Sequence, residues 1–599
     1  MRKVFIFNIG LLFFQLTCAQ YPAIQWQNTI GGNAGDKLIV IHQTYDGGYI
    51  LGGYSYSGIS GDKTEDVLGA FRSDYWIVKL DSMGEIEWQN TIGGDLDDEL
   101  YDIQETYGGG YIVGGTSYSN ISGDKTESNF SYEPDYWIIK LDTIGNIEWQ
   151  NTIGANGAEY LQSIRQTFDG GYIVGGTSTS DISGDKTEAG FGVCDYWLLK
   201  LDTSGVIEWQ RTIGGNAYEA LNVVRQTLDG GYFLAGTSQS DISGWKTENS
   251  VAGSQDYWVL KLDTVGEIVW QNTIGGDGMD WLYCADRTAD NGYILGGFSY
   301  SGISGDKTEV AWGSGDFWVI KINTSGEIEW QSDYGGFGTD VMNAVQQTND
   351  GGYIIGGYTS SGITGNKTEI CNGFFDYWVI KLDGDGLQQW QHSLGGTSEN
   401  LLFSLGQTND DGYILGGYSS SGISGDKTEI SQGDYDYWVI KLYCDSALTF
   451  YADLDEDLFG DALNPYTTCD GFMPAGFVEN NTDCNDADAS IYPGAPELLD
   501  GLDNNCNDSI DEGMVAIGLI QSNLIIHCYP NPAFNFLTIE TDFSTKKTIY
   551  LTDALGQIVQ TINSSENIIT INLNNISSGI YFIKMEDGIH STTQKFVKQ

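Results

Sequence analysis

At 599 residues, the chain is too long for one ordinary hydrophobic core, so several domains are expected. Its formal net charge of −55 excludes nucleic acid and anionic membrane surfaces as partners, because like charges repel. Aromatic residues make up 13% of the chain, with 81 glycines and only 8 prolines. This balance favours many short strands joined by glycine turns over disorder.

The first 19 residues have the pattern of a secretory signal peptide. A basic start, Arg2-Lys3, precedes an apolar run from Val4 to Leu16, and small residues then allow cleavage before Gln20. Cys18 raises the alternative of a lipoprotein, but Gln15-Leu16-Thr17 matches a lipobox poorly. No later stretch approaches the ~18 apolar residues of a membrane span, so we predict an exported mature protein without a transmembrane segment.

Three motifs recur seven times between residues 26 and 438, with spacings of 60 to 62 residues. The first is WQ(N/R)TIGG or a close variant, the second is GY(I/F), and the third is D(Y/F)W followed by an aliphatic pair and Lys. Their marker residues are Trp26, Trp88, Trp149, Trp209, Trp270, Trp330 and Trp390; Tyr49, Tyr111, Tyr172, Tyr232, Tyr293, Tyr353 and Tyr413; and Trp76, Trp137, Trp197, Trp258, Trp318, Trp378 and Trp438. Such periodicity indicates a repeat architecture.

Each unit predicts four antiparallel strands. In the third unit these are residues 161–167, 172–178, 195–202 and 206–215, separated by a tight Asp-Gly-Gly turn, a long polar loop and a Thr-Ser-Gly turn. Val, Ile, Tyr, Trp and Thr dominate these runs, and no helical period is present. Four short strands every 60 residues are typical of a β-propeller blade.

The ends of the repeat region predict a closed ring. The seventh unit stops after residues 436–442 without a fourth strand, whereas residues 23–32 form a fourth strand without a unit. Pairing the two would complete the seventh blade and remove an open sheet edge. A linear solenoid would need caps, and none is visible. We therefore predict an all-β fold whose largest domain, residues 20–443, is a seven-bladed propeller.

The hairpin K-(L/I)-D-x-x-G-x-I-x-W, present in most units, resembles the tryptophan-docking hairpin of quinoprotein propellers. It is also loosely similar to the Asp-box turn of sialidases. Both devices are structural in those families, so the resemblance implies that the tryptophan packs between blades. We expect these Trp and Tyr residues to belong to the core.

The long second-to-third loops and the fourth-to-first connectors share one face of the ring, where propellers usually bind partners. The loops repeat S-x-I-S-G-D-K-T-E, and two hypotheses fit their acidic residues, Asp62, Asp124, Asp185, Asp306 and Asp426. They form either a ring for cations or sugar hydroxyls, or turns that hold the blades; the uniform repetition favours the structural role. Trp245, Trp281 and Trp312 depart from the repeat and are weaker candidates for a ligand platform.

Catalysis finds little support in the sequence. The four histidines, at positions 42, 392, 527 and 590, recur at no repeated position. Gly-x-Ser-x-Gly, His-Glu-x-x-His and phosphate-loop motifs are absent. We predict no catalytic and no cofactor-binding residues, although a pair of carboxylates as in glycoside hydrolases could escape notice among so many acids.

Residues 444–513 change character and become rich in Asp and Asn. Oxygens stand at loop positions one, three, five, seven and nine, as Ca²⁺ requires. They belong to Asp453, Asp455, Asp457, the Phe459 carbonyl and Asp461. Leu458 replaces the usual position-six glycine and Asn464 the usual position-twelve glutamate, so the loop is not an EF-hand. A second cluster repeats the logic with Asp503, Asn505, Asn507, Asp511 and Glu512.

The runs DCNDADASIYPGAPE and DGLDNNCNDSIDEG resemble a family of metal-binding motifs related to a copper-binding surface protein of methanotrophs. That family usually has Cys where Leu499 stands, which leaves its disulfide pairing open here; two bridges among Cys444, Cys469, Cys484 and Cys506 are plausible. Copper prefers soft or imidazole ligands. Because the clusters hold only oxygen donors, we predict Ca²⁺ as the bound ion; an acidic linker without an ion is the alternative. Cys194, Cys284 and Cys371 lie in different blades and are expected to be unpaired.

After a linker at 514–527, residues 528–599 alternate strands and turns as in a small Ig-like β-sandwich. This segment resembles the type A C-terminal sorting domain of type IX secretion in Bacteroidetes. The resemblance rests on YPNP at 529–532, the Asp553–Gly556 turn, SSGIYFIK at 577–584 and the ending KFVKQ. The resemblance implies the type IX machinery as a partner, and attachment to the outer cell surface or release.

These features favour a secreted or surface-attached, non-enzymatic binding protein that presents a propeller face to a glycan or protein ligand. A polysaccharide-active hydrolase or a quinoprotein-like enzyme is the first alternative, and a structural coat protein is the second. A quinoprotein-like enzyme should carry an asymmetric cluster of basic and stacking residues in its central channel, which nearly equal blades do not suggest.

Overall fold

The computed structural model describes residues 22–443, 448–468, 473, 476–511, 526–541, 545–588 and 591–599. Strands dominate these residues, and the helical element among them is a single 3-10 turn at Val251–Gly253. The chain divides into two compact units, of which the first ends at Asn481 and the second begins at Thr482. The described residues include no helix long and apolar enough to cross a membrane.

Each of the seven units forms a separate four-stranded antiparallel sheet, as the repeats predicted. In the third blade the strands are β10 (Glu159–Gln166), β11 (Tyr172–Ser178), β12 (Asp195–Leu201) and β13 (Ile207–Ile213). The first blade is β2 (Asp36–Gln43), β3 (Tyr49–Ser55), β4 (Asp74–Leu80) and β5 (Ile86–Ile92), and the second is β6 (Asp98–Glu105), β7 (Tyr111–Ser117), β8 (Asp135–Leu141) and β9 (Ile147–Ile153). The fourth is β14 (Glu219–Gln226), β15 (Tyr232–Ser238), β16 (Asp256–Leu262) and β17 (Ile268–Ile274), and the fifth is β18 (Asp280–Arg287), β19 (Tyr293–Ser299), β20 (Asp316–Ile322) and β21 (Ile328–Tyr334). The sixth is β22 (Asp340–Gln347), β23 (Tyr353–Thr359), β24 (Asp376–Leu382) and β25 (Gln388–Leu394), and the seventh is β26 (Asn400–Gln407), β27 (Tyr413–Ser419), β28 (Asp436–Tyr443) and β1 (Ala23–Ile30).

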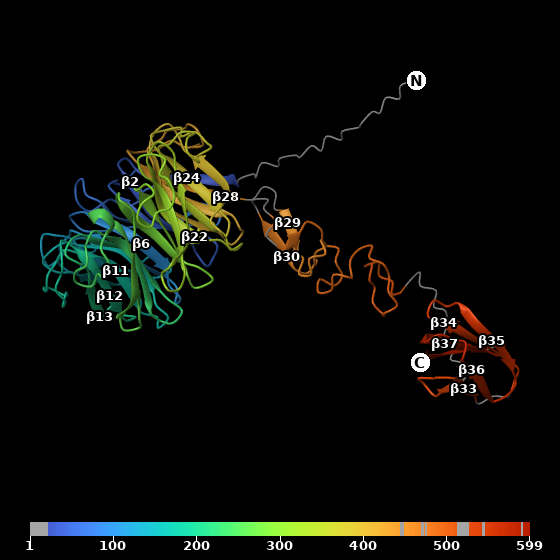
Figure 1. Cartoon of the computed structure of the whole chain (residues 1–599). Helices are drawn as coiled ribbons and strands as arrows, with labels where there is room; N and C mark the ends of the chain where they lie inside the picture. The colour runs from blue at the N-terminus through green and yellow to red at the C-terminus, as the bar shows by residue number, and fades with distance from the viewer. Residues whose placement is uncertain are drawn as a thin grey trace, which may run out of the picture. The chain divides into compact units, whose positions relative to one another are not determined.

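The ring closes through the N-terminal strand. β1 pairs antiparallel with β28, with Thr29 opposite Trp438 and Ile30 opposite Tyr437. The blue β1 lies beside the yellow β28 in Figure 1. The innermost strands also contact one another in sequence around the ring, and β26 of the last blade meets β2 of the first. The predicted closed seven-bladed propeller is confirmed.

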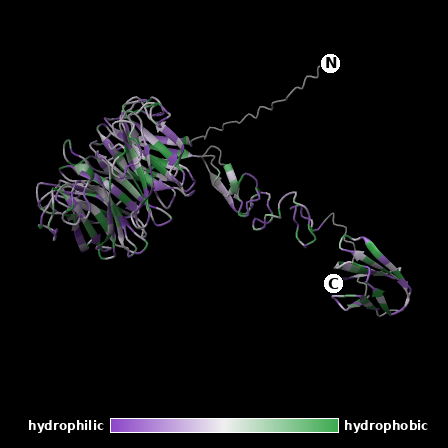
Figure 2. Cartoon of the chain, in the orientation of Figure 1, coloured by the Kyte–Doolittle hydropathy of each residue, from purple (hydrophilic) through white to green (hydrophobic). Residues whose placement is uncertain are grey.

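Aromatic residues fill the space between blades. Trp76 and its six equivalents are completely buried. Tyr75 donates a hydrogen bond of 3.1 Å from its hydroxyl to the carbonyl of Trp137 in the next blade, and the rings lie 5.0 Å apart. Trp88, on the outer strand of the first blade, packs edge-on against Tyr111 of the second at 5.8 Å. Figure 2 shows the resulting hydrophobic strands among hydrophilic loops. The expected structural role of these residues is confirmed.

Two buried carboxyl groups face each other at most blade junctions. At the first junction these are Asp74, which begins β4, and Asp98, which begins β6 of the next blade; both are fully buried. Burial, followed by smaller contributions that include the Asp98 charge, raises the pKa of Asp74 to about 7. The sixth junction differs, because Asn400 replaces the second acid and its Nδ2 donates a hydrogen bond of 3.2 Å to Asp376.

A small three-stranded sheet consists of β29 (Leu448–Ala452), β30 (Pro465–Thr468) and β31 (Phe477–Val478). In the second unit, two sheets form a sandwich over a core that includes Leu537, Ile549, Ile583 and Phe596. One sheet contains β32 (Ile526–Tyr529), β33 (Phe536–Thr541) and β36 (Ile568–Asn572), and the other contains β35 (Ile558–Ser564), β34 (Lys547–Asp553), β37 (Gly579–Glu586) and β38 (Ser591–Lys598).

Candidate functional site

The first acidic loop gathers three carboxylates. Oxygens of Asp453, Asp455 and Asp457 lie within 4.8 Å of one another. Asp453 accepts hydrogen bonds of 3.1 Å from the backbone N–H groups of both Asp457 and Leu458, which folds the loop back on its first residue. One oxygen of Asp457, Oδ2, is buried and accepts no hydrogen bond within the described residues. A buried carboxylate oxygen without a donor fits a bound cation.

The backbone of this loop makes the turn that a calcium loop needs at position six. Leu458 adopts a φ of 77°, in the left-handed region that glycine usually occupies, and Glu456 adopts 63°. The Leu458 side chain is exposed, so it meets no obstacle there. The departure from glycine therefore leaves the turn in place, at a cost of roughly 1 kcal/mol for a non-glycine residue in this region.

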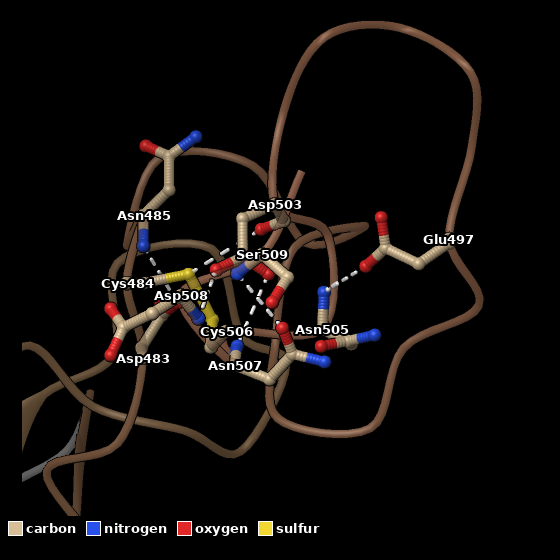
Figure 3. The surroundings of a disulfide bond; sticks show 10 residues. All are labelled: Asp483, Cys484, Asn485, Glu497, Asp503, Asn505, Cys506, Asn507, Asp508 and Ser509. Carbon is tan, nitrogen blue, oxygen red and sulfur yellow. Dashed lines mark hydrogen bonds between the residues drawn. A yellow bond between two sulfur atoms is a disulfide. The ribbon is translucent and has the colours of Figure 1, made fainter. Parts of the chain in front are cut away.

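The second acidic loop repeats the same backbone pattern. Asp503 accepts hydrogen bonds from the N–H groups of Asn507 and Asp508 at 3.1 and 2.7 Å, and Asn507 accepts one from Ser509 at 2.9 Å. In the first loop, Asp457 likewise accepts from Phe459 at 2.9 Å. Asp508, at position six, has a φ of 67°. Two loops of unrelated flanking sequence thus share one pattern of backbone hydrogen bonds, and Figure 3 shows the second of them.

In both loops, the residue at position nine accepts hydrogen bonds from nearby donors of the chain. Asp461 accepts from the N–H of Leu463 and from Asn464, and Asp511 accepts from the N–H groups of Asp500 and Gly501. The structure thus brings together the first three acids of the first loop. Glu512 lies outside the described residues.

Cys484 and Cys506 form a disulfide that closes the second loop at its fourth position. Figure 3 shows this disulfide, which joins Cys484, the residue after Asp483, to the turn at 503–509. Its two sulfurs are therefore not available as thiolate ligands, and the donor set is one of oxygens, which suits a hard divalent cation. Cys444 and Cys469 lie outside the described residues, so a second bridge stays a prediction. Cys194, Cys284 and Cys371 are unpaired, as expected.

The repeated loops on the propeller face are structural. Asp124 accepts a hydrogen bond of 3.2 Å from the N–H of Gly93, and the equivalent acids bond the equivalent connectors. The next residue, Lys125, is buried, with its ammonium 5.2 Å from the ring centre of Trp137. Glu127 accepts a hydrogen bond of 2.6 Å from the N–H of Thr152. Packing thus accounts for the D-K-T-E repeat.

The three tryptophans that depart from the repeat occupy different environments. Trp245 is 38% exposed, in the loop position that aspartate holds in five other blades and asparagine in one. Trp312 is 47% exposed and packs against Gly365 of the next blade, as Phe130 packs against Gly184. Trp281 lies on the innermost strand β18, donates its indole N–H to Gln255 and packs 5.3 Å from Phe298.

Further aromatic residues surround Trp281 at the end of the inner strands that carries the long loops. Tyr160, Tyr218, Tyr283 and Tyr300 are each 36 to 44% exposed. Burial and the nearby hydroxyls of Tyr358, Tyr218 and Tyr300 raise the pKa of Tyr283, so these four tyrosines lie in one neighbourhood. Tyr160 lies near Tyr218, because its hydroxyl is among the groups that raise the pKa of Tyr218. Phe298 lies between Trp281 and Tyr300, 4.8 Å from the latter. We call Tyr160, Tyr218, Trp281, Tyr283 and Tyr300 the aromatic arc; it extends over blades three to five.

A cavity of about 420 Å³ is lined by all seven innermost strands, and Tyr283 of the arc is part of its lining. Its walls differ around the ring. Arg165 of β10 forms an ion pair with Asp102 of β6, and Arg225 lies on the adjacent β14. Phe403 and Leu405 of β26 line the cavity elsewhere. Although the blades are nearly equal in sequence, the channel is not uniform, because arginines line it at β10 and β14. The signal was present at the seventh position of the inner strands, which varies between His, Gln, Arg, Asp and Gly.

Family models match two parts of the chain. Residues 527–599 match the model described as "Secretion system C-terminal sorting domain", and residues 483–512 match the one described as "Putative metal-binding motif". The chain is a secreted surface protein. No curated protein matches.

Solved structures that resemble the chain do so at low identity. BBS1N, from a complex with ARL6DN, is 11% identical over 70% of this chain and 96% of its own, with a TM-score of 0.37. The Pan2 WD40 domain of Neurospora crassa is 9% identical over 69% and 95%, with a TM-score of 0.36. Puromycin hydrolase is 10% identical over 87% and 61%, with a TM-score of 0.39.

Proposed function

We propose that this protein is a non-enzymatic glycan-binding protein of the cell surface, which holds its ligand at the aromatic arc over the central cavity. The arc is the observation that carries the proposal. Apolar C–H faces of sugar rings pack against aromatic rings, while sugar hydroxyls need nearby polar groups. The lining of the cavity supplies such groups through Gln162, Asn222 and Asn343.

The size and rigidity of the site support this use. A volume of about 420 Å³ falls within the range of small-molecule sites. The walls are the innermost strands of the seven blades, which the closed ring holds in place, so the site is organised before a ligand arrives. The arc lies on the propeller face that carries the long loops, whose own repeated residues are committed to packing. Only the residues that vary between blades remain for recognition.

The oxygen-lined loops support a second part of the proposal, in which each loop binds Ca²⁺. In the first loop the ion would be ligated by Asp453, Asp455 and Asp457, and in the second by Asp503, Asn505 and Asn507. These ions would not take part in binding the glycan. Bound Ca²⁺ would neutralise clustered acids and stiffen the segment that follows the propeller. The sorting domain would supply the interaction with the type IX machinery.

A glycan array with the recombinant mature chain, with Ca²⁺ and with chelator, tests the function. We expect defined glycans to bind, and we expect Trp281→Ala and Tyr283→Ala to weaken that binding at least about tenfold, since each removes a stacking surface. Tyr45→Ala is the matched control. Tyr45 is 74% exposed in the β2–β3 turn, at the opposite end of the inner strands.

Binding that survives both arc substitutions would contradict the proposal. An array without any bound glycan would favour a protein ligand or a coat role. Mass spectrometry of the incubated glycans separates binding from hydrolysis, because an enzyme would release products.

A further inference from the structure

Arginine is rare in this chain, yet two arginines line its channel. Of six arginines in 599 residues, three lie on innermost strands: Arg165, Arg225 and Arg287. Arg165 and Arg225 hold the same position on neighbouring strands, where other blades have His42, Gln104, Asp286, Gln346 or Gly406. A residue required for packing would recur around the ring, as the buried Trp and Lys residues do. These two arginines break the repeat.

Both guanidinium groups line the cavity and are incompletely engaged. Arg165 bonds Asp102 and the carbonyl of Ile164 through Nη1. Arg225 bonds its own neighbour's carbonyl, that of Val224, at 2.9 Å, and Ser163 at 3.4 Å, also through Nη1. The nearest acid to Arg225, Asp286, is 3.9 Å from its Nε. The Nη2 groups of both arginines make no hydrogen bond within the described residues.

Like charges meet here without full compensation. Burial and, next, the charge of Arg165 lower the pKa of Arg225 to about 10. Burial and the charges of Arg165 and Arg225 lower the pKa of His42 to about 4, so its imidazole is neutral at pH 7. Burial raises the pKa of Asp286, and the charge of Arg225 acts in the opposite direction. Two guanidinium groups thus lie together in the channel of a strongly acidic protein.

We infer that the cavity binds a carboxylate group of a small ligand, with Arg225 and Arg165 as its donors and the aromatic arc against the rest of the molecule. The inference rests on the proposed function, because it assigns acidic sugars as the preferred class. Two sources share this chemistry: the uronic acid end of a glycan, and a free carboxylic acid.

A carboxylate suits the site better than a phosphate. Each guanidinium presents a planar fork that matches two carboxylate oxygens. Asp102 and Asp286 lie in the same neighbourhood and would repel the second charge of a phosphate dianion. A sugar acid carries its carboxylate on a ring that can stack, so one ligand would use both the arc and the arginines.

The experiment measures binding to the mature chain, at pH 7 and low salt, of a glucuronate-ended disaccharide, its glucose-ended counterpart and acetate. We expect the acidic disaccharide to bind at least about tenfold more tightly than the neutral one. In Arg225→Gln the preference should fall below about threefold, because the acidic disaccharide loses a charged donor that the neutral one does not need. Arg225→Lys, which keeps the charge and loses the fork, should lie between.

Arg211→Gln is the matched control, because Arg211 lies on the outer strand β13 and pairs with Glu188 and Glu267 away from the cavity. Equal affinity for the two disaccharides, or an acid preference that survives Arg225→Gln in a folded variant, would overturn the inference and leave the proposed function standing. Acetate binding that depends on Arg225, without disaccharide binding, would support a free acid and overturn the proposed function. Failure of all three probes would overturn both.

Discussion

Replacing Asn400 by aspartate should make the propeller sensitive to pH at one blade junction. Asn400 is fully buried, and its amide donates to Asp376 at 3.2 Å. The substitution Asn400→Asp removes that donor and places a second acid beside Asp376. At the first junction, Asp98 and Asp74 already form such a pair, so the structure supplies its own reference for the effect.

The magnitude follows from Asp98. Burial, the largest influence, raises its pKa to about 6 from the ordinary 3.8. At about 1.4 kcal/mol per pH unit, keeping such a group ionised in the folded protein costs roughly 3 kcal/mol. Because the pKa is raised in the folded state, the full stability is present below about pH 4 and is lost as the pH rises through about 6. Asn400→Asp should therefore lose roughly 3 kcal/mol at pH 8 and little at pH 4.

Tryptophan fluorescence suits the assay, because all 17 tryptophans lie between residues 26 and 438 and report the propeller alone. Thermal unfolding at pH 5 and pH 8 would be compared for the wild type, Asn400→Asp and the converse Asp98→Asn. We expect Asp98→Asn to be more stable than the wild type at pH 8, because it removes a buried charge and supplies a donor to Asp74. Equal pH dependence in all three proteins would refute the reasoning.

Three further predictions concern closure and the metal loops. Deleting residues 23–30 should expose the edge of β28 and cause association, seen by light scattering, whereas a propeller closed without β1 would stay monodisperse. Leu458→Gly should tighten Ca²⁺ binding severalfold in calorimetry by relieving the left-handed leucine, and unchanged affinity would count against the calcium loop. Replacing both Cys484 and Cys506 by serine should destabilise the second loop by about 3 kcal/mol and weaken its Ca²⁺ binding; an unaltered titration would show that the bridge does not hold the loop.

The propeller could be predicted from sequence because its information is repeated. Seven copies of one strand pattern make errors in one unit visible against the others, and the missing fourth strand after residue 442 identified the partner of residues 23–32. The β11 strand, Tyr172–Ser178, begins and ends where it was expected. The alternation of apolar and polar residues decides such boundaries locally.

The channel could not be predicted in the same way, because its residues meet only after closure. Asp102 and Arg165 are separated by 63 positions in the chain and form an ion pair across two blades. The same holds for Asn400, whose meaning depends on Asp376 at the blade junction. The sequence shows which residues depart from the repeat, but it does not show which side chains of other blades they contact. In the acidic loops, the ligand types were visible, whereas the turning of Asp461 toward Leu463 depends on the backbone.

The central claim is that the varied side chains above the channel bind a sugar without altering it. The most direct test incubates the mature chain with each glycan that it retains on an array and then analyses the bound fraction by mass spectrometry. The account predicts an intact glycan, released in lower amount from Tyr283→Ala. Shortened or oxidised products that form with wild-type protein would contradict it.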